Sequence, residues 1–229
     1  MWQGLDASVL QDRVSNYRLF SRLFLRPLSE ADIDTIAELK LEEVAKDMEG
    51  ESLLKSGFND MGRGLHRRHS GTSRVLSTDF TMCFDGVSSY AGLVALPYAS
   101  IFKGSITGEK AILFQEPRTY ALRAYRKEGV EVDESLHLPE DHLSFELSFM
   151  ADLSEQALLA YKASNFDEAA RLLEVSKTFL CDNILNWYDD FKDLSLKILD
   201  TRFYRGVVKA TAGYLALDLE TVADLLCAA

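Results

Sequence analysis

The sequence predicts an all-α protein, and three observations lead to this fold class. Apolar residues recur every three or four positions over most of the 229 residues. Helix start and stop signals flank these runs, and strand-like alternation is confined to one short stretch, AILF at residues 111–114. Hydrophobic residues make up 47% and charged residues 27% of the chain, as is typical of a globular protein. We therefore expect a compact multi-helix bundle without a significant sheet.

Helix boundaries in the N-terminal third follow from capping residues and helix breakers. A serine at the start of a helix accepts a backbone N–H, whereas proline or glycine ends the run. The expected elements are a helix from a capping box at Ser8 and Gln11 to Pro27, a short helix from Ser29, one from about Glu42 to Leu54, and one over SRVLSTDFTMCF that ends near Gly86. The basic, glycine-rich stretch from Gly62 to Arg74 is expected to be a connection.

The middle of the chain is expected to contain little regular structure. Three glycines and Pro97 interrupt the residues from Gly86 to Phe114, which predicts a long loop with one helical turn. Loops of this length are usually functional or act as linkers. The sequence EPRTYALRAYRKEG then predicts a helix that ends at Gly129, and an acidic loop follows over residues 130–138.

Everything after Pro139 is expected to be helical. Proline at the first helical position and acids in the first turn favour a start there. The stretch Ala157–Lys177 predicts one antiparallel helix pair rather than a tetratricopeptide array, because no repeat of about 34 residues precedes it. Gly206, Ala210 and Gly213 share one side of the last long helix and permit close approach of a neighbour.

We expect one all-helical domain over residues 1–229, divided into two lobes. The N-terminal lobe is expected over about residues 1–102, a hinge or loop region over about 103–138, and the C-terminal lobe over about 139–229. The three cysteines are far apart and form no C-x-x-C pair, which indicates a reducing compartment. Neither a secretory signal nor an apolar run long enough to span a bilayer is present, so we expect a cytoplasmic protein without stable membrane insertion.

Negative charge is concentrated in one segment of the chain. The net charge is −11, and no lysine or arginine occurs between Lys127 and Lys162, where nine acidic residues lie. Such a segment repels nucleic acid and attracts a basic partner. The alternative is a solvated acidic face that only aids solubility. Glu140, Asp141 and His142 lie together in this segment, and a histidine at the positive end of a helix is expected to be neutral.

No catalytic, metal or cofactor site is predicted. GSITGEKA, residues 104–111, lacks the spacing of a phosphate loop and the Ser or Thr after its lysine. His66 and His69 lie among arginines that repel a metal cation. Asp141 and His142 have no nucleophile in a recognisable elbow. We therefore expect a non-enzymatic protein that needs no cofactor.

Several segments occur in an order that is typical of one family. They are YRLFSRLFLRPLSE, LSTDFTMCFDG, LPYASIF, AILFQEPRTYALRAYRKEGVEVD, LPEDHLSFELSFMADL and the tail FLCDNILNWYDDFKDL with RFYRGVVKATAGYL. Together they resemble the TorD/DmsD family of redox-enzyme maturation chaperones over about residues 10–220. Cys83, Ala99 and Asn183 depart from the residues usual in the family, which leaves the client undetermined.

The resemblance implies a chaperone that binds the twin-arginine leader of a molybdopterin oxidoreductase. Such a chaperone holds the apoprotein in the cytoplasm until the cofactor is inserted, and so delays export. Its partners would be the leader and the apoprotein, with weak guanine-nucleotide binding left open, and it would be a monomer or a homodimer. A nitrate-reductase-type assembly chaperone of the same superfamily is the first alternative, and a nucleotide-hydrolysing protein is the second.

The resemblance also implies a peptide-binding groove with an anionic mouth. Apolar side chains would form its wall, and Glu140 and Asp141 would receive the arginines, with His142 bonding a leader carbonyl or fixing the loop. There are two alternatives. Phe80 and Phe84 could lie in the core, and the residues from Glu140 to His142 could only cap a helix. The candidate peptide-binding residues are Asp79, Phe80, Phe84, Pro97, Tyr98, Ser100, Glu140, Asp141 and His142.

Overall fold

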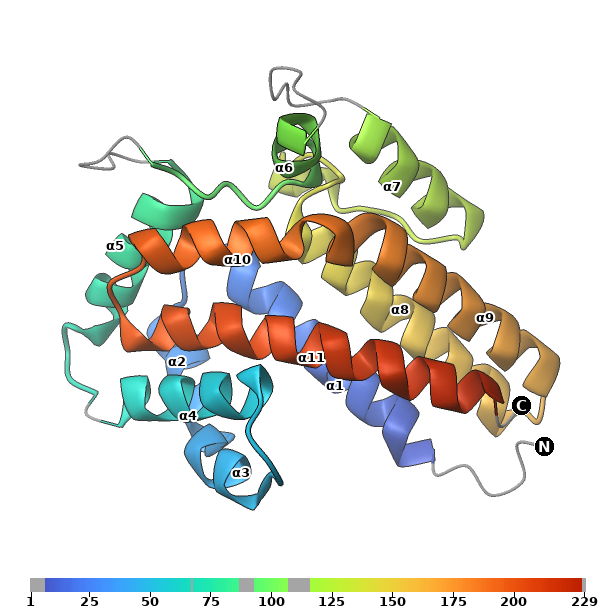
Figure 1. Ribbon diagram of the computed structural model, residues 1–229, viewed down its shortest axis with the longest axis horizontal. Coiled ribbons are helices and arrows are strands. Elements are labelled where there is room, and N and C mark those ends of the chain that lie inside the picture. The colour runs from blue at the N-terminus through green and yellow to red at the C-terminus, as the bar shows by residue number, and fades with distance from the viewer. Residues whose placement is uncertain (1–6, 67, 87–92, 107–115, 228–229) are drawn as a thin grey trace. The chain divides into compact units, whose positions relative to one another are not determined.

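The computed structural model describes residues 7–66, 68–86, 93–106 and 116–227, and every regular element in them is helical (Figure 1). No strand occurs in the described residues, where the β-type pairing found is one bridge between Tyr98 and His142. The predicted all-α class is therefore confirmed. The AILF stretch and most of the residues that resemble a phosphate loop lie outside the described residues.

The chain forms two compact units, and each combines stretches that are distant in the sequence. The first unit comprises Met1–Arg22, Tyr98–Trp187 and Leu217–Ala229, and the second comprises Leu23–Pro97 and Tyr188–Ala216. The lobes expected from the sequence follow chain order, whereas each compact unit contains residues from both halves of the chain.

The first unit contains most of α1 and the helices in the middle of the chain. Its elements are α1 (Ala7–Leu25) up to Arg22, α6 (Ala99–Ile106), α7 (Glu116–Lys127), the short 3₁₀ turn Glu134–Leu136, α8 (Leu143–Lys162), α9 (Phe166–Phe179), the π-helical turn Leu180–Leu185 and the end of α11 (Arg202–Cys227). Helices α8 and α9 pack as the predicted antiparallel pair (Figure 1). Asn165 begins α9 by accepting the Glu168 N–H, and Gly129 follows α7 with a φ of 71°.

The second unit contains α2 (Glu30–Glu38), α3 (Leu41–Asp47), α4 (Leu53–Leu65), α5 (Thr72–Phe84), α10 (Asn186–Ile198) after its first two residues, and the first part of α11. Ser29 and Asp32 form the capping box of α2, so the predicted start is confirmed. The helix predicted from Glu42 to Leu54 is wrong. It ends at Asp47, Gly50 adopts a φ of 66°, and Ser52 caps a new helix that continues into the predicted connection.

Small residues let α4 and α11 approach closely within the second unit. A Cβ added at Gly206 would lie 2.6 Å from the backbone nitrogen of Met61, and one at Gly213 would overlap the backbone of Leu54. Gly57 on α4 likewise faces the backbone of Ala210. The predicted close approach along this side of the last helix is confirmed.

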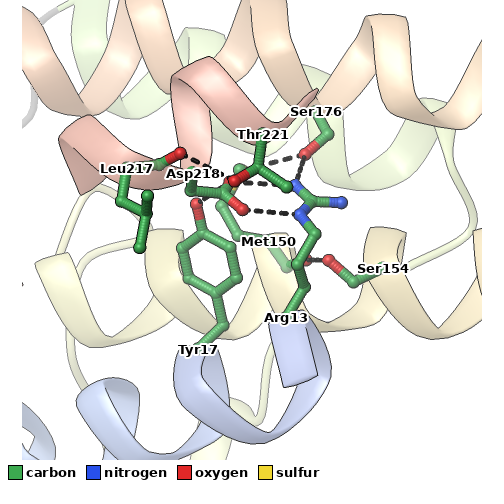
Figure 2. Close-up of polar contacts among 8 residues, drawn as sticks. All are labelled: Arg13, Tyr17, Met150, Ser154, Ser176, Leu217, Asp218 and Thr221. Carbon is green, nitrogen blue, oxygen red and sulfur yellow. Dashed lines mark hydrogen bonds and ion pairs between the residues drawn. The ribbon is translucent and has the colours of Figure 1, made fainter. Parts of the chain in front are cut away.

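A buried ion pair joins the first and last helices of the first unit (Figure 2). Arg13 donates from Nε to Oδ1 of Asp218 at 2.6 Å and from Nη2 to Oδ2 at 3.0 Å. Tyr17 donates to the same carboxylate at 2.6 Å, and Arg13 also donates to Ser176 Oγ at 2.7 Å. Because Asp218 is bonded by three donor atoms, its charge is compensated although the side chain is buried.

Three boundaries differ from the sequence prediction. Helix α8 begins at Leu143, so Pro139 lies in the turn before it rather than at its first position. Ser8 lies inside α1, which begins at Ala7. The helical segment in the predicted long loop, α6, extends over eight residues. None of the described helices is long and apolar enough to cross a membrane.

Candidate functional site

His142 caps α8 and is neutral in this environment. Its backbone is extended, with φ −70° and ψ 132°, and its Nδ1 accepts the N–H of Ser144 at 3.1 Å. An accepting Nδ1 carries no proton, so the imidazole proton lies on Nε2. The side chain is 4% exposed, and this burial lowers the pKa of His142 to about 3. The prediction of a neutral histidine at the positive end of a helix agrees with this geometry.

The loop before α6 is held against the turn before α8. Tyr98 pairs with His142 through the backbone, and their rings meet edge to face with centroids 4.9 Å apart. The Ala99 N–H donates to the Asp141 carbonyl at 3.1 Å, and the Ser100 N–H donates to Asp141 Oδ2 at 2.9 Å. Asp141 therefore bonds a backbone N–H in the first turn of α6, where a negative charge is also favoured by the helix dipole.

Glu140 forms an ion pair with Arg118 of the same chain. Arg118 on α7 donates from Nη2 to Glu140 Oε1 at 3.1 Å and from Nε to Oε2. This bidentate pair lowers the pKa of the Glu140 carboxyl. The Tyr125 hydroxyl donates to the Glu140 carbonyl at 2.9 Å. An incoming arginine would therefore have to share the Glu140 carboxylate with Arg118 or displace it. The ion pair borders a hollow of about 790 Å³ that Arg126 and Pro139 also line.

The buried carboxyl of Glu146 lies one helical turn after His142, the residue that caps α8. Glu146 is 0% exposed, and neither of its carboxylate oxygens has a hydrogen bond of good geometry, although the Trp187 indole lies near enough to favour the charged form. Asp141 Oδ1, Ser100 Oγ and Asn183 Nδ2 are likewise buried without a hydrogen-bond partner. Burial raises the pKa of the Glu146 carboxyl well above its usual value, and the nearby Asp141 raises it further.

Lys103 on α6 is the cation that acts on the Glu146 carboxyl by lowering its pKa. Its ammonium is half-buried and donates to the Asp182 carbonyl at 2.8 Å. Burial lowers the pKa of Lys103, while Glu146, Asp182 and Asp141 act in the opposite direction. Phe102, the preceding residue, stacks on Trp187 with centroids 5.5 Å apart, which fixes this helix on the first unit. We call Ser100, Lys103, Asp141, Glu146 and Asn183 the Glu146 cluster.

Sequence reasoning missed the importance of Glu146 and Lys103. Glu146 interrupts the apolar run LSFELSFM and shares a helix face with His142 and Phe149. An acid on the same face as two buried rings is a signal of a buried carboxyl, and it could have been found. Lys103 gave no such signal, because its proximity to Glu146 depends on tertiary packing.

The other four predicted site residues belong to the second unit. Asp79 accepts the N–H groups of Asp200 and Thr201, each at 3.0 Å, and so holds the start of α11. Phe80 and Phe84 are 1% and 2% exposed and pack in an aromatic core with Phe24, Phe191 and Tyr204. They therefore line the core, as the alternative interpretation proposed, and not a groove. Pro97 is buried and is the last residue of the segment Leu23–Pro97 of this unit.

Comparison with known proteins identifies the family. The model of a family described as nitrate reductase delta subunit matches residues 51–193, which is more than half of the chain. The chain belongs to this family.

Curated relatives of this family member include chaperones with the name TorD. A Chaperone protein TorD of Vibrio parahaemolyticus is 25% identical over 210 residues, which cover 91% of this chain and 93% of the relative. One from Vibrio cholerae is 25% identical over 220 residues, with 94% of both chains covered. One from Photobacterium profundum is 30% identical over 126 residues, 54% of each chain. The predicted membership of the TorD chaperone family is confirmed, and with it the prediction of a non-enzymatic protein.

A second concave surface of this family member lies between α7 and α9 of the first unit. The groove has a volume of about 620 Å³, and its lining is mainly apolar, with Tyr120 46% exposed at its edge and Phe179 at its base. Arg171 beside it is held by Glu128 and Glu168. The sequence did not predict this groove.

The histidines dismissed as a metal pair each have another partner. His66 Nδ1 lies 3.9 Å from a Glu42 oxygen, and His69 Nδ1 accepts the Gly71 N–H at 3.0 Å. Over the described part of the chain, no group of three or more His, Cys, Asp or Glu side chains is placed to hold a metal ion.

Proposed function

We propose that this protein is a cytoplasmic chaperone that binds the twin-arginine leader of a molybdopterin oxidoreductase. It would hold the apoprotein until the cofactor is inserted and so delay export. Relatives named as chaperones over more than nine-tenths of this chain support the general role. The observation that carries the finer proposal is the group of buried and half-buried acids at the start of α8, namely Glu140, Asp141 and Glu146.

The chemistry of a twin-arginine leader matches this group. The leader has a basic start followed by an apolar stretch, so its receptor needs acceptors for guanidinium groups beside apolar or aromatic side chains. At the start of α8, carboxyl groups lie beside the half-buried ring of Tyr98 and the neutral imidazole of His142. The segment around them carries no lysine or arginine from residue 128 to residue 161, so nothing within it repels a cation.

The curated relatives favour a leader-binding chaperone over the nitrate-reductase-type alternative. The family description names a nitrate reductase subunit, whereas the full-length relatives are chaperones named TorD. Nucleotide binding has no support from the described residues, where no group of three or more His, Cys, Asp or Glu side chains could hold the metal ion of a nucleotide.

The proposal predicts that a leader peptide binds and that Asp141→Asn weakens the binding. The variant keeps the shape of the side chain but loses the negative charge at the start of α8. A hydrogen bond to a charged group contributes about 1.5–3 kcal/mol, so we expect roughly 10-fold weaker binding or more. Titration calorimetry with a synthetic peptide that carries two consecutive arginines before an apolar stretch measures this change. The affinity of the wild-type protein should also fall with added salt.

Asp79→Asn is the matched control for this experiment. Asp79 is also a buried aspartate that accepts backbone N–H groups at the start of a helix, and it lies in the second unit. Both variants should melt at lower temperature, because each loses a charge-assisted cap. Only Asp141→Asn should lose leader affinity. Equal loss of affinity in the two variants, or a wild-type protein that binds no leader peptide, would contradict the proposal.

A further inference from the structure

We infer that the Glu146 cluster is an internal binding site for one guanidinium group of the leader, and that Lys103 is the competing cation of the free protein. This inference rests on the proposed function and assigns its cation-binding site to residues of the cluster. Glu140, which the sequence indicated, already has Arg118 as its partner. The carboxylate without a hydrogen-bonded partner in this part of the first unit is that of Glu146.

The acceptors in the cluster match the donors of an arginine. A guanidinium group has five N–H donors in one plane and no acceptor. The cluster offers both oxygens of Glu146, Oδ1 of Asp141 and the hydroxyl oxygen of Ser100, all buried and without hydrogen bonds. Unpaired buried polar atoms are unfavourable, and these four unpaired acceptors outnumber the one unpaired donor of the cluster, Nδ2 of Asn183, which favours a ligand rich in donors.

Lys103 is the member of the Glu146 cluster that is partly exposed, whereas the other four are buried. Its ammonium bonds the Asp182 carbonyl and acts on Glu146 only through space, since no ion pair joins the two side chains. The side chain is half-buried and flexible, so the ammonium can turn outward into water while its stem stays in place. An arginine that enters beside this stem finds the Glu146 oxygens free.

Binding of the guanidinium group releases the proton of Glu146, so the net charge of the site does not change. Burial raises the pKa of Glu146, and among the groups around it Asp141 acts in the same direction, whereas Lys103 and the Trp187 indole act against it. Other titratable groups near the cluster are Asp182 beside Lys103, Tyr125 on α7, and His142, which shares a face of the helix with Glu146. The free protein therefore favours the neutral acid form of Glu146. When the guanidinium binds, the O–H bond of Glu146 breaks, the proton passes to solvent, and the carboxylate pairs with the arginine.

Calorimetric titration of a twin-arginine peptide in two buffers tests this exchange. The difference between phosphate and Tris, which have different heats of ionisation, gives the number of protons released on binding. For the wild-type protein near pH 7 we expect about one proton per peptide, and tighter binding as the pH rises. Glu146→Gln should release no proton from this site and should bind roughly 10-fold more weakly or worse. The fold should survive, because the amide closely matches the neutral acid.

Three further measurements make the result specific. Glu155→Gln makes the same substitution at an exposed position of α8 and should leave affinity and proton release unchanged. Lys103→Met removes the competing cation and should tighten binding several-fold while the proton is still released. A peptide with two lysines in place of the arginines should bind more weakly, because an ammonium has only three donors.

Two outcomes separate this inference from the proposed function. If the wild-type protein binds the arginine peptide but Glu146→Gln binds it equally well, with the same proton release, the Glu146 cluster is not the site and the leader proposal stands. If the wild-type protein binds neither peptide, both the leader proposal and the assignment of its arginine site are overturned.

Discussion

At the scale of single residues, His142 shows why a titratable side chain can serve as a helix cap. The neutral ring accepts the Ser144 N–H, and burial against Tyr98 keeps it from taking a second proton near neutral pH. A histidinium at this position would lose its acceptor and would face the positive end of α8. The cap therefore depends on pH.

We predict that acid weakens the fold through His142. The pKa of a solvent-exposed histidine is 6.5, and that of His142 in the folded protein is about 3, so the unfolded chain binds more protons between these values. Stability then rises with pH over this window and is lost as pH falls through 6.5. Between pH 7 and pH 5 the loss amounts to about 2 kcal/mol.

Urea unfolding of the wild-type protein and of His142→Asn at both pH values measures this loss. Asparagine is a good helix cap that does not titrate in this range. Other groups, such as Glu146, titrate equally in the two proteins, so the difference between them isolates His142. The wild-type protein should lose about 2 kcal/mol relative to the variant between pH 7 and pH 5. Parallel changes in the two proteins would show that His142 does not carry the effect.

The sequence could predict the importance of the residues around Asp141 but not their partners. A histidine among acids at a helix start can be recognised from the sequence alone, and its neutrality follows from the helix dipole. That Glu140 pairs with Arg118 could not be predicted, because 22 positions separate the two residues and no spacing rule links them. Helical spacing of Phe80 and Phe84 favoured the core only slightly over a groove, since both surfaces favour the same side chains.

At the scale of elements, the starts predicted from Ser29 and Asn165 agree with the structure, whereas the start predicted at Pro139 lies four residues before α8 begins. Ser29 and Asn165 begin α2 and α9 as expected from their side chains. The helix predicted from Glu42 to Leu54 failed because its apolar spacing continues across a real break. Gly50 and Ser52 were the signals of that break, since glycine permits the positive φ and serine caps α4.

The close packing of α4 and α11 predicts a large effect of one added methyl group. Gly213→Ala places a Cβ against the backbone of Leu54, which cannot move as a side-chain end could. Overpacking of this kind costs about 1–3 kcal/mol, so we expect a clearly lower midpoint of thermal or urea unfolding.

Ala216→Ser is the control for this variant. It also adds one heavy atom to α11, but on its exposed side within the same unit. Its stability should stay within about 0.5 kcal/mol of the wild-type value. If both variants unfold at the same urea concentration as the wild-type protein, α4 and α11 do not pack as closely as the structure places them.

At the scale of the whole molecule, the all-α class could be predicted but the division into units could not. Helical periodicity is a local property and was sufficient for the class. The first unit depends on contacts such as that between Arg13 and Asp218, which are 205 positions apart. A charged residue within the apolar pattern of α1 does not reveal whether it faces water or a buried carboxylate, so the contact appears only in three dimensions.

The central claim is that a leader peptide binds at the start of α8 and to the adjoining α6, and hydrogen exchange over the whole chain tests it most directly. The protein is compared with and without a saturating twin-arginine peptide, and α3 and α4 serve as the internal reference. We predict slower exchange at residues 98–103 and 140–147, which contain Tyr98, Lys103, Asp141 and Glu146. Protection confined to the groove between α7 and α9, with these two segments unchanged, would contradict the claim.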